Sequence, residues 1–332
     1  MLRYLAFRVG TMISTLLVTS VLIFTIIQLP PGDYLTNYIG ELRAEGDSQA
    51  EEKVAFLREQ YGLDQPLPIQ YLRWISGFVR GDFGYSFEYA APVSEVMGDR
   101  VFLTLVLNFA TVLFVYLVSF PLGLYVARRK GSLADRSLTL TGYLGLATPN
   151  FLLALILLYL ANALFGISIG GLMDPAYADE GWSAAKIGSM LAHLVVPVVV
   201  IGTSGTAAMI QRLRANLLDE LRRPYVVAAT ARGLPGGFVL RKYALRSALN
   251  PFVSDIGDIL PQIVSGSVII SVIMSLPTTG PMLLSSLRSQ DMYLAGSFLM
   301  FLAILTVAGM LVSDIILALV DPRVRLSARR GA

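Results

Sequence analysis

The chain has 332 residues, of which 55% are hydrophobic and only 15% are charged, and its formal net charge is +3. This composition excludes a disordered chain and is unusual for a soluble globular protein. Because the sequence contains no cysteine, it also excludes disulfides, thiol catalysis and cysteine-ligated metals or clusters.

Six stretches approach the length of about 20 mostly apolar residues that a membrane-spanning helix needs. They predict an all-α polytopic membrane protein with six transmembrane helices. The predicted spans are residues 9–29, 101–126, 137–165, 187–210, 255–277 and 296–320. Pro149 and Pro197 interrupt the third and fourth spans, where we expect kinks. Arg3 and Arg8 precede the first apolar run, which ends without a small-residue cleavage site, so we expect a retained span rather than a signal peptide.

Lys and Arg are concentrated in the short loops and tails that alternate spans would place on one side. They lie before the first span, in 127–136, in 211–254 and after the last span, whereas the segment 30–100 is rich in Asp and Glu. The positive-inside rule therefore predicts that both termini are cytoplasmic, N-in and C-in, with a large extracytoplasmic segment after the first span. The basic charge reflects this topology and requires no nucleic acid as a partner.

The spans divide the chain into four predicted regions. These are a first transmembrane helix in 1–30, an extracytoplasmic segment in 31–100, a five-helix transmembrane core in 101–320 that includes a cytoplasmic coupling loop in 211–254, and a cytoplasmic tail in 321–332. In the second region, Ser48 and Glu51 form a capping box that predicts a helix over 49–60. The aromatic stretch 71–79 has two interpretations: a helix lying along the outer membrane surface, or part of a small folded cap over the bundle.

The sequence lacks the common motifs of nucleotide and metal chemistry. It contains no Gly-Lys dipeptide, and hence no phosphate-binding P-loop, and no HExxH motif. The single histidine, His193, cannot form a histidine-rich metal site, and we expect it to be a packed, hydrogen-bonded residue of the fourth span. We therefore predict no cofactor and no metal in this chain, and any energy from ATP must come from a different subunit.

Three acidic residues lie within the predicted spans, where ionisable groups are functional candidates, for example as proton relays. Asp255 and Asp258 begin the fifth span, and Asp314 lies about two turns from the inner end of the sixth. A structural explanation exists for each: acids in a first helical turn interact favourably with the helix dipole, and Asp314 can pair with a basic residue of the inner surface.

The loop 211–254 is too structured in its sequence to be a simple linker. Pro224 suits the first turn of a helix, and Gly233 suits its C-terminal end, so we expect a short helix over residues 225–234. Ala228 and Ala229 give this helix a face of small residues, which allows another surface to approach closely. After a Pro-Gly-Gly turn at 235–237, apolar residues at helical spacing predict an amphipathic helix that continues into the fifth span.

At these residues the chain resembles the permease subunits of binding-protein-dependent ABC importers, in particular the oligopeptide/dipeptide/nickel branch. The superfamily signature is Glu-Ala-Ala, three residues, then Gly, and here it matches 227–233 with Val227 in place of the Glu. Further resemblance is carried by TARGL at 230–234, VL at 239–240, ALRSALNP at 244–251, LVDPRVRL at 319–326, YGLDQPLPIQYLRW at 61–74, GDFGYSF at 81–87 and TPNFLLA at 148–154. It covers nearly the whole chain.

One departure bears on the substrate. Where the branch often has an acid before a Pro-Gly-x-Gly motif, this chain has Ser271 and then Pro277-Thr-Thr-Gly280. Relatives that import oligosaccharides resemble this form, so oligosaccharides remain an alternative to oligopeptides.

The resemblance implies a subunit of the bacterial inner membrane that performs no bond chemistry itself. Its implied partners are a second homologous permease chain, two cytoplasmic ABC ATPases that use ATP and Mg, an extracytoplasmic substrate-binding protein, and membrane lipid. Ala228, Ala229 and Gly233 would allow close approach of the ATPase, and Arg232 and Leu234 would contact its groove. From the residues alone, a proton-coupled secondary transporter that uses the acids of the spans stays an alternative, as does a membrane protease or scaffold.

Overall fold

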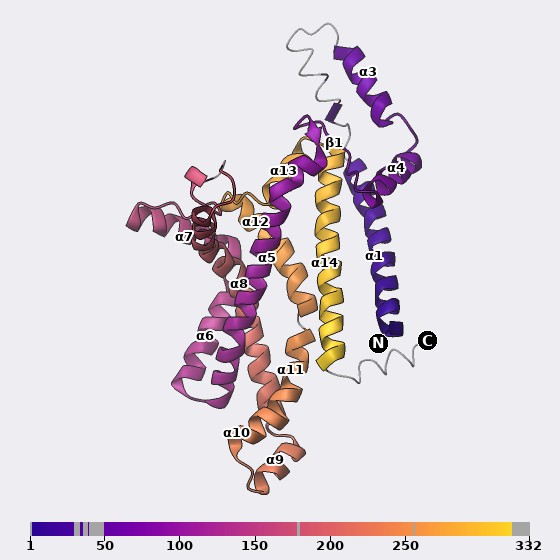
Figure 1. Cartoon of the computed structure of the whole chain (residues 1–332). Coiled ribbons are helices and arrows are strands. Elements are labelled where there is room, and N and C mark those ends of the chain that lie inside the picture. Colours follow the sequence, from indigo (N-terminus) through magenta and orange to yellow (C-terminus); the bar gives the residue numbers. More distant parts are fainter. Residues whose placement is uncertain are drawn as a thin grey trace. The chain divides into compact units, whose positions relative to one another are not determined.

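The computed structural model describes residues 2–29, 34–35, 39, 50–177, 180–254 and 256–320. Over these residues the chain is almost entirely helical (Figure 1). It folds as two compact units. The larger unit comprises Met1–Val9, Thr104–Pro277 and Ala308–Ala332, and the smaller unit comprises Gly10–Leu103 and Thr278–Val307.

Four helices in the described part of the chain are long and apolar enough to cross a membrane. They coincide with the first, second, fourth and sixth predicted spans. These helices are α1 (Leu2–Gln28), α5 (Val93–Arg128), α8 (Ala184–Glu220) and α14 (Met292–Val320). Gly98 has non-helical backbone angles inside α5, so the straight part of that helix begins after it, close to the predicted start of the second span.

The third predicted span is broken rather than kinked. Helices α6 (Leu133–Ala147) and α7 (Asn150–Phe165) meet at an angle of 99°, so the expectation of a kinked but continuous helix is wrong. Thr148 is extended, with a ψ of 118°, because the ring of Pro149 disfavours helical angles in the residue before it. Pro197, by contrast, lies inside a continuous α8. The same residue type therefore produces a break at one site and is tolerated at the other.

Close packing at glycines joins α6 to α8 in the larger unit. A Cβ atom added to Gly145 would lie 3.2 Å from the side chain of Thr203, and one added to Gly142 would lie 3.1 Å from Gln211. Small residues of this kind let helix backbones approach closely in a membrane. Helix α12 (Ile256–Ile273) takes the place of the fifth predicted span, although its apolar part, Gln262–Ile273, is shorter than a full span.

The smaller unit has a core rich in aromatic side chains. Trp74 is 5% exposed and contacts Phe24 of α1 and Phe78, with ring centroids 6.0 and 6.1 Å apart. The hydroxyl groups of Tyr71 and Ser20 are joined by a hydrogen bond of 2.8 Å. The stretch 71–79 is therefore part of a folded unit, as one of its two interpretations proposed. The elements around this core include α3 (Ala50–Tyr61), α4 (Leu67–Val79), β1 (Tyr85–Ser86), β2 (Ala91–Pro92) and α13 (Thr279–Arg288).

The predicted helix over 49–60 is present as α3, while the first two residues of its capping box lie outside the described residues. Strands β1 and β2 pair antiparallel and form a two-residue ladder, a small exception to the all-α prediction. A short 3₁₀ helix, η1 (Pro175–Tyr177), lies in the larger unit between α7 and α8.

The smaller unit contains a buried carboxylate at the start of α14. Asp291 is fully buried and accepts hydrogen bonds from Ser86 Oγ at 2.7 Å, from the Glu88 amide at 3.2 Å and from the Leu294 amide at 3.2 Å. The last of these bonds caps the N-terminus of α14. Burial raises the pKa of the Asp291 carboxyl above its ordinary value, while the hydrogen bonds act in the opposite direction.

Candidate coupling loop

The loop 211–254 is folded along its described length, and its first part continues a membrane helix. Helix α8 extends to Glu220, ten residues beyond the predicted end of the fourth span at residue 210. The remaining elements are α9 (Pro224–Ala231), α10 (Gly236–Val239), the π-helical turn η2 (Leu240–Ala244) and α11 (Leu245–Ser254). We call residues 211–254 the coupling loop.

Local signals explain why α9 begins and ends where it does. Pro224 occupies the first helical turn, where its missing N–H has no intrahelical partner to lose. Gly233 follows the helix with a φ of +77°, a left-handed conformation that favours glycine. The short helix and both of its local signals are confirmed, although the helix ends at Ala231, before the predicted end at residue 234. The predicted Pro-Gly-Gly turn is wrong in part, because Pro235 is the N-cap of α10 and Gly236 and Gly237 form its first turn.

A small hydrophobic cluster holds the coupling loop together. Its buried members come from the end of α5, from α8, and from α9, α10, η2 and α11 of the loop. They are Ala127, Leu217, Val226, Ala229, Val239, Leu240, Ala244 and Ala248. Burying one side chain of the size of Val contributes about 1.5–3 kcal/mol relative to exposure. The loop therefore packs as one body on the ends of α5 and α8.

The cluster decides which residues of α9 face outward. Ala229 is 6% exposed and packs into the cluster, which corrects the expectation that its side chain belongs to an outer face of small residues. Val227 is 55% exposed, and Ala228 is also exposed. Arg232 and Gly233 extend this exposed surface, whereas Leu234 is half-buried and packs against the cluster.

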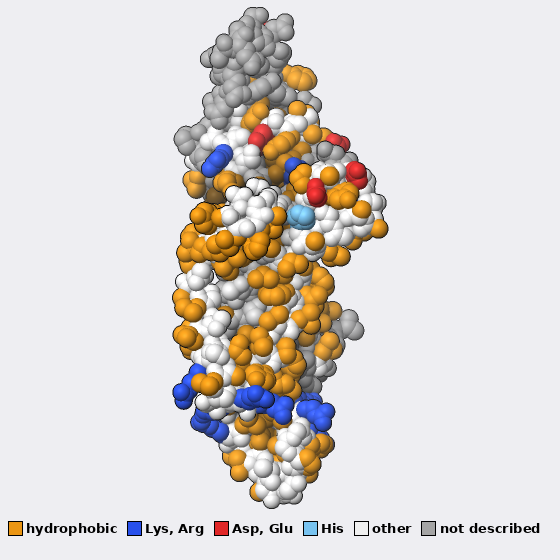
Figure 2. Space-filling model, turned by 90° about the vertical axis from the view of Figure 1, so that its left-hand side faces the viewer, with side chains coloured by type: hydrophobic (Ala, Val, Ile, Leu, Met, Phe, Trp, Pro, Cys, Tyr) orange, Lys and Arg blue, Asp and Glu red, His pale blue; other side chains and the backbone are white. Residues whose placement is uncertain are grey.

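Most charged side chains lie beside the exposed surface of α9 rather than on it. On the face of the molecule drawn in Figure 2, Lys and Arg side chains gather in a band beside the end that carries α9 and α10, and the end itself shows none. Tyr225 donates a hydrogen bond to Glu220, and Arg223 Nε lies 3.8 Å from the same carboxylate. The exposed residues of α9 are thus uncharged and include Tyr225, Val227 and Ala228, and Arg232 directly follows the helix.

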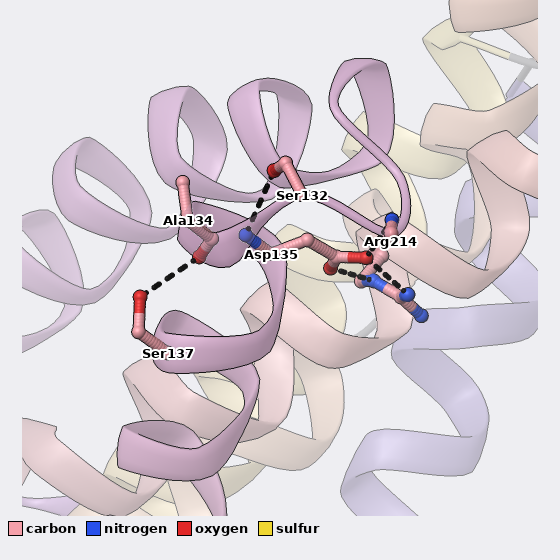
Figure 3. Close-up of polar contacts among 6 residues, drawn as sticks. Ser132, Ala134, Asp135, Ser137 and Arg214 are labelled. Carbon is pink, nitrogen blue, oxygen red and sulfur yellow. Dashed lines mark hydrogen bonds and ion pairs between the residues drawn. The ribbon is translucent and has the colours of Figure 1, made fainter.

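A buried ion pair joins α6 to α8 (Figure 3). Arg214 Nε donates to Asp135 Oδ1 at 2.7 Å, and Arg214 Nη2 donates to Asp135 Oδ2 at 2.9 Å. The side chain of Asp135 is 4% exposed and that of Arg214 is 25% exposed. The Gly131 amide also donates to Asp135 at 2.8 Å, and Ser132 Oγ accepts from the Asp135 amide, which caps α6.

Sequence reasoning missed this pair, although one signal was available. Asp135 is the only acid in the otherwise basic segment 127–136. An isolated acid that is surrounded by cations and follows an N-cap serine is a candidate for a specific partner. The partner itself, 79 residues away on α8, could not be chosen from the sequence.

The three acids predicted as functional candidates have different outcomes. Asp314 pairs with Arg8 at 3.0 Å, which confirms the expectation that it finds a basic partner. Asp255 lies outside the described residues, and the side chain of Asp258 is not among those described. His193 Nδ1 lies 2.9 Å from the Ser189 carbonyl oxygen, in agreement with a hydrogen-bonded residue of α8.

The comparison with known families decides what kind of protein carries this loop. The family described as "Binding-protein-dependent transport system inner membrane component" matches residues 119–326. The chain belongs to this family. A second match, described as "Binding-prot-dependent transport system membrane comp, N-term", covers residues 1–108. Together the two matches include the coupling loop and most of the described helices.

Characterised relatives extend over nearly the whole chain. The oligopeptide transport system permease protein AppB of Bacillus subtilis is 32% identical over 325 residues, which cover 98% of this chain and 99% of the relative. The glutathione transport system permease protein GsiC of Salmonella paratyphi A is 28% identical over 98% of this chain and 99% of its own. The dipeptide transport system permease protein DppB of Escherichia coli is also 28% identical, over 98% of this chain and 99% of its own.

Membership of this family confirms the resemblance noted in the sequence. The chain is a multi-pass component of the inner membrane and a permease subunit of an ABC importer. Subunits of this kind carry no ATPase site, and separate subunits hydrolyse ATP.

Proposed function

We propose that the chain forms half of the translocation pathway of a peptide importer. The names of its relatives support peptides as the substrate class, since AppB and DppB are permeases of oligopeptide and dipeptide systems. ATP hydrolysis in separate subunits drives the transport, and this chain binds no cofactor of its own. The chain has two conformations, and their relative stability changes when its partners change state.

The observation that carries this proposal is the coupling loop, which packs as one body on α5 and α8 and exposes an uncharged surface of α9 that includes Ala228. Ala228, Arg232 and Gly233 form the surface that meets an ATPase, and Ala229 and Leu234 support it from inside. Because the loop packs on α5 and α8, a displacement of α9 is passed to both helices. The pair between Asp135 and Arg214 then passes it on from α8 to α6.

A topology with six spans and both termini in the cytoplasm fits this role. It places the coupling loop on the side of the ATPases, and it assigns 1–30 to the first span, 31–100 to an extracytoplasmic segment, 101–320 to the core and 321–332 to the tail. The fifth and third spans are then α12 and the broken pair of α6 and α7. A second permease chain, two ATPases and a substrate-binding protein complete the proposed complex.

Purification from native membranes tests the assembly. The expected co-purifying chains are a second permease and ATPases, and peptide should stimulate ATP hydrolysis when the binding protein is added. An oligosaccharide that stimulates hydrolysis where peptides fail would replace the peptide assignment with the alternative. Uptake that follows the proton gradient in the absence of ATPases would refute the proposal, and the pairing of Asp314 with Arg8 argues against a free proton carrier at that position.

A further inference from the structure

A cavity lies where the helix pair of α6 and α7 is broken. Its volume is about 290 Å³, close to the lower limit of about 300 Å³ for ligand pockets. Five segments contribute: the end of α6, the break, the start of α7, α8 and α12. The lining residues are Leu146, Thr148, Pro149, Asn150, Phe151, Ser204, Gly266, Ile269 and Ile270.

The position of the break is compatible with a water-filled cavity. Non-helical backbone at membrane depth is tolerated only where protein buries it or where it lines a water-filled space. Ser204 precedes Arg214 by ten residues on α8, or about 15 Å along the helix axis. This is about half of the 30 Å hydrocarbon core, so with Arg214 near the inner surface the cavity lies near the middle of the membrane.

The chemistry of the lining selects an uncharged polar chain. Asn150 Nδ2 donates to the Ile201 carbonyl and to Ser204 Oγ, each at 3.2 Å, which fixes the amide beside the break. Its carbonyl oxygen remains an acceptor, and the hydroxyls of Thr148 and Ser204 add further hydrogen-bonding capacity. The lining residues include no charged side chain. A ligand charge would have no counter-charge here, whereas backbone amides would find hydrogen bonds and apolar side chains would find Phe151, Ile269 and Ile270.

We propose that this cavity is a section of the translocation pathway that holds the backbone of a passing peptide, with Thr148, Asn150 and Ser204 as its polar contacts. This inference rests on the proposed function and adds a location to it. Since the polar contacts are made to backbone amides, they require no particular peptide sequence, although a charged side chain would find no counter-charge here. Oligosaccharides fit less well, because sugar rings stack on aromatic faces and the lining contains one aromatic residue, Phe151.

The natural absence of cysteine makes the test direct. Thr148→Cys and Ser204→Cys are introduced singly into the intact transporter, reconstituted in proteoliposomes, and treated with a membrane-impermeant maleimide. Both should react, and a transported peptide should slow the reaction at least about tenfold, since protection scales with occupancy. Leu155→Cys and Ile156→Cys are the controls, because both side chains lie on α7 outside the cavity, 47% and 43% exposed. They should react only with a lipid-soluble maleimide.

A second variant tests the cavity without relying on polar side chains. A Cβ at Gly266 would meet nothing within 4 Å, so Gly266→Leu can fold and project into the cavity. It should reduce peptide transport about tenfold or more while the complex still assembles, and Gly188→Leu, at an equally open position of α8 outside the cavity, should not.

The outcomes separate this inference from the proposed function. If the complex transports peptides but neither cavity cysteine reacts with the impermeant reagent, or peptide gives no protection, the inference is overturned and the proposed function stands. If peptides are neither transported nor protective while an oligosaccharide is both, the peptide assignment fails in both proposals.

Discussion

The pair of Asp135 and Arg214 offers a quantitative test of how α6 is held to α8. Arg214→Gln would leave a carboxylate that is 4% exposed without its cationic partner, while the Gly131 amide still donates to it. Removing one partner of a buried pair destabilises by about 3–5 kcal/mol. Asp135→Asn should destabilise less, by about 1–3 kcal/mol, because the Arg214 side chain is 25% exposed and can reach water.

The double variant distinguishes a specific pair from two independent effects. Asp135→Asn with Arg214→Gln should be more stable than the sum of the single changes predicts, with a coupling energy of about 1–3 kcal/mol. The apparent unfolding temperature of the purified complex measures this, and that of the double variant should lie above the value obtained by adding the two single shifts. The pair of Arg58 and Asp64, at 3.9 Å with the Asp64 side chain 67% exposed, is the control, and Asp64→Asn should change stability by less than about 1 kcal/mol.

Two results would refute this reasoning. One is strict additivity of the two changes, which would mean that the contact contributes nothing as a pair. The other is a stable double variant that transports as much peptide per ATP as the unchanged protein, which would show that α6 does not need this connection to follow α8.

Three further predictions address the coupling loop, the inner ion pair and the buried acid. Gly233→Asp should uncouple ATP hydrolysis from transport without affecting insertion, because a side chain at a φ of +77° is strained and its carboxylate would project from the exposed surface. Gly236→Ala, in open helical surroundings, is its control. Normal transport by Gly233→Asp would contradict the docking assignment. Asp314→Asn should lower the unfolding temperature without changing the response of uptake to a proton gradient, and a changed response would support the proton-coupled alternative. The free energy of unfolding should fall as pH rises through the raised pKa of Asp291. The reason is that, between the ordinary and the raised value of this pKa, the folded state binds more protons than the unfolded state. Asp291→Asn should flatten that dependence.

Local signals predicted those parts of the fold that depend on one or a few neighbouring residues. Pro224 and Gly233 act on the backbone at their own positions, so the limits of α9 followed from the sequence. Pro149 likewise marked the interruption of the third span. The 99° angle could not be predicted, because it depends on how α7 packs against α8 and α12, which are distant in sequence.

The orientation of α9 shows a prediction that the sequence could have improved. Ala228 and Ala229 are adjacent and point about 100° apart on a helix, so they cannot share one face fully. Val226 and Ala229 have the three-residue spacing of a common face, and both are buried in the cluster. The spacing in the sequence thus indicated which face of α9 is buried, but it did not indicate that this face packs against α5 and α8.

The π-helical turn η2 sets the rotational phase between α10 and α11. The Leu245 amide bonds to the Leu240 carbonyl, five residues back, so this turn contains one residue more than an α-helical turn. Deleting one residue there would restore regular α-helix and rotate everything before it by about 100° relative to α11. The outward face of α9 would then turn toward a different neighbour, although no residue of α9 itself had changed. The number of residues in the single turn η2 therefore determines the direction in which α9 faces, and with it the direction in which a force on α9 is passed to α11.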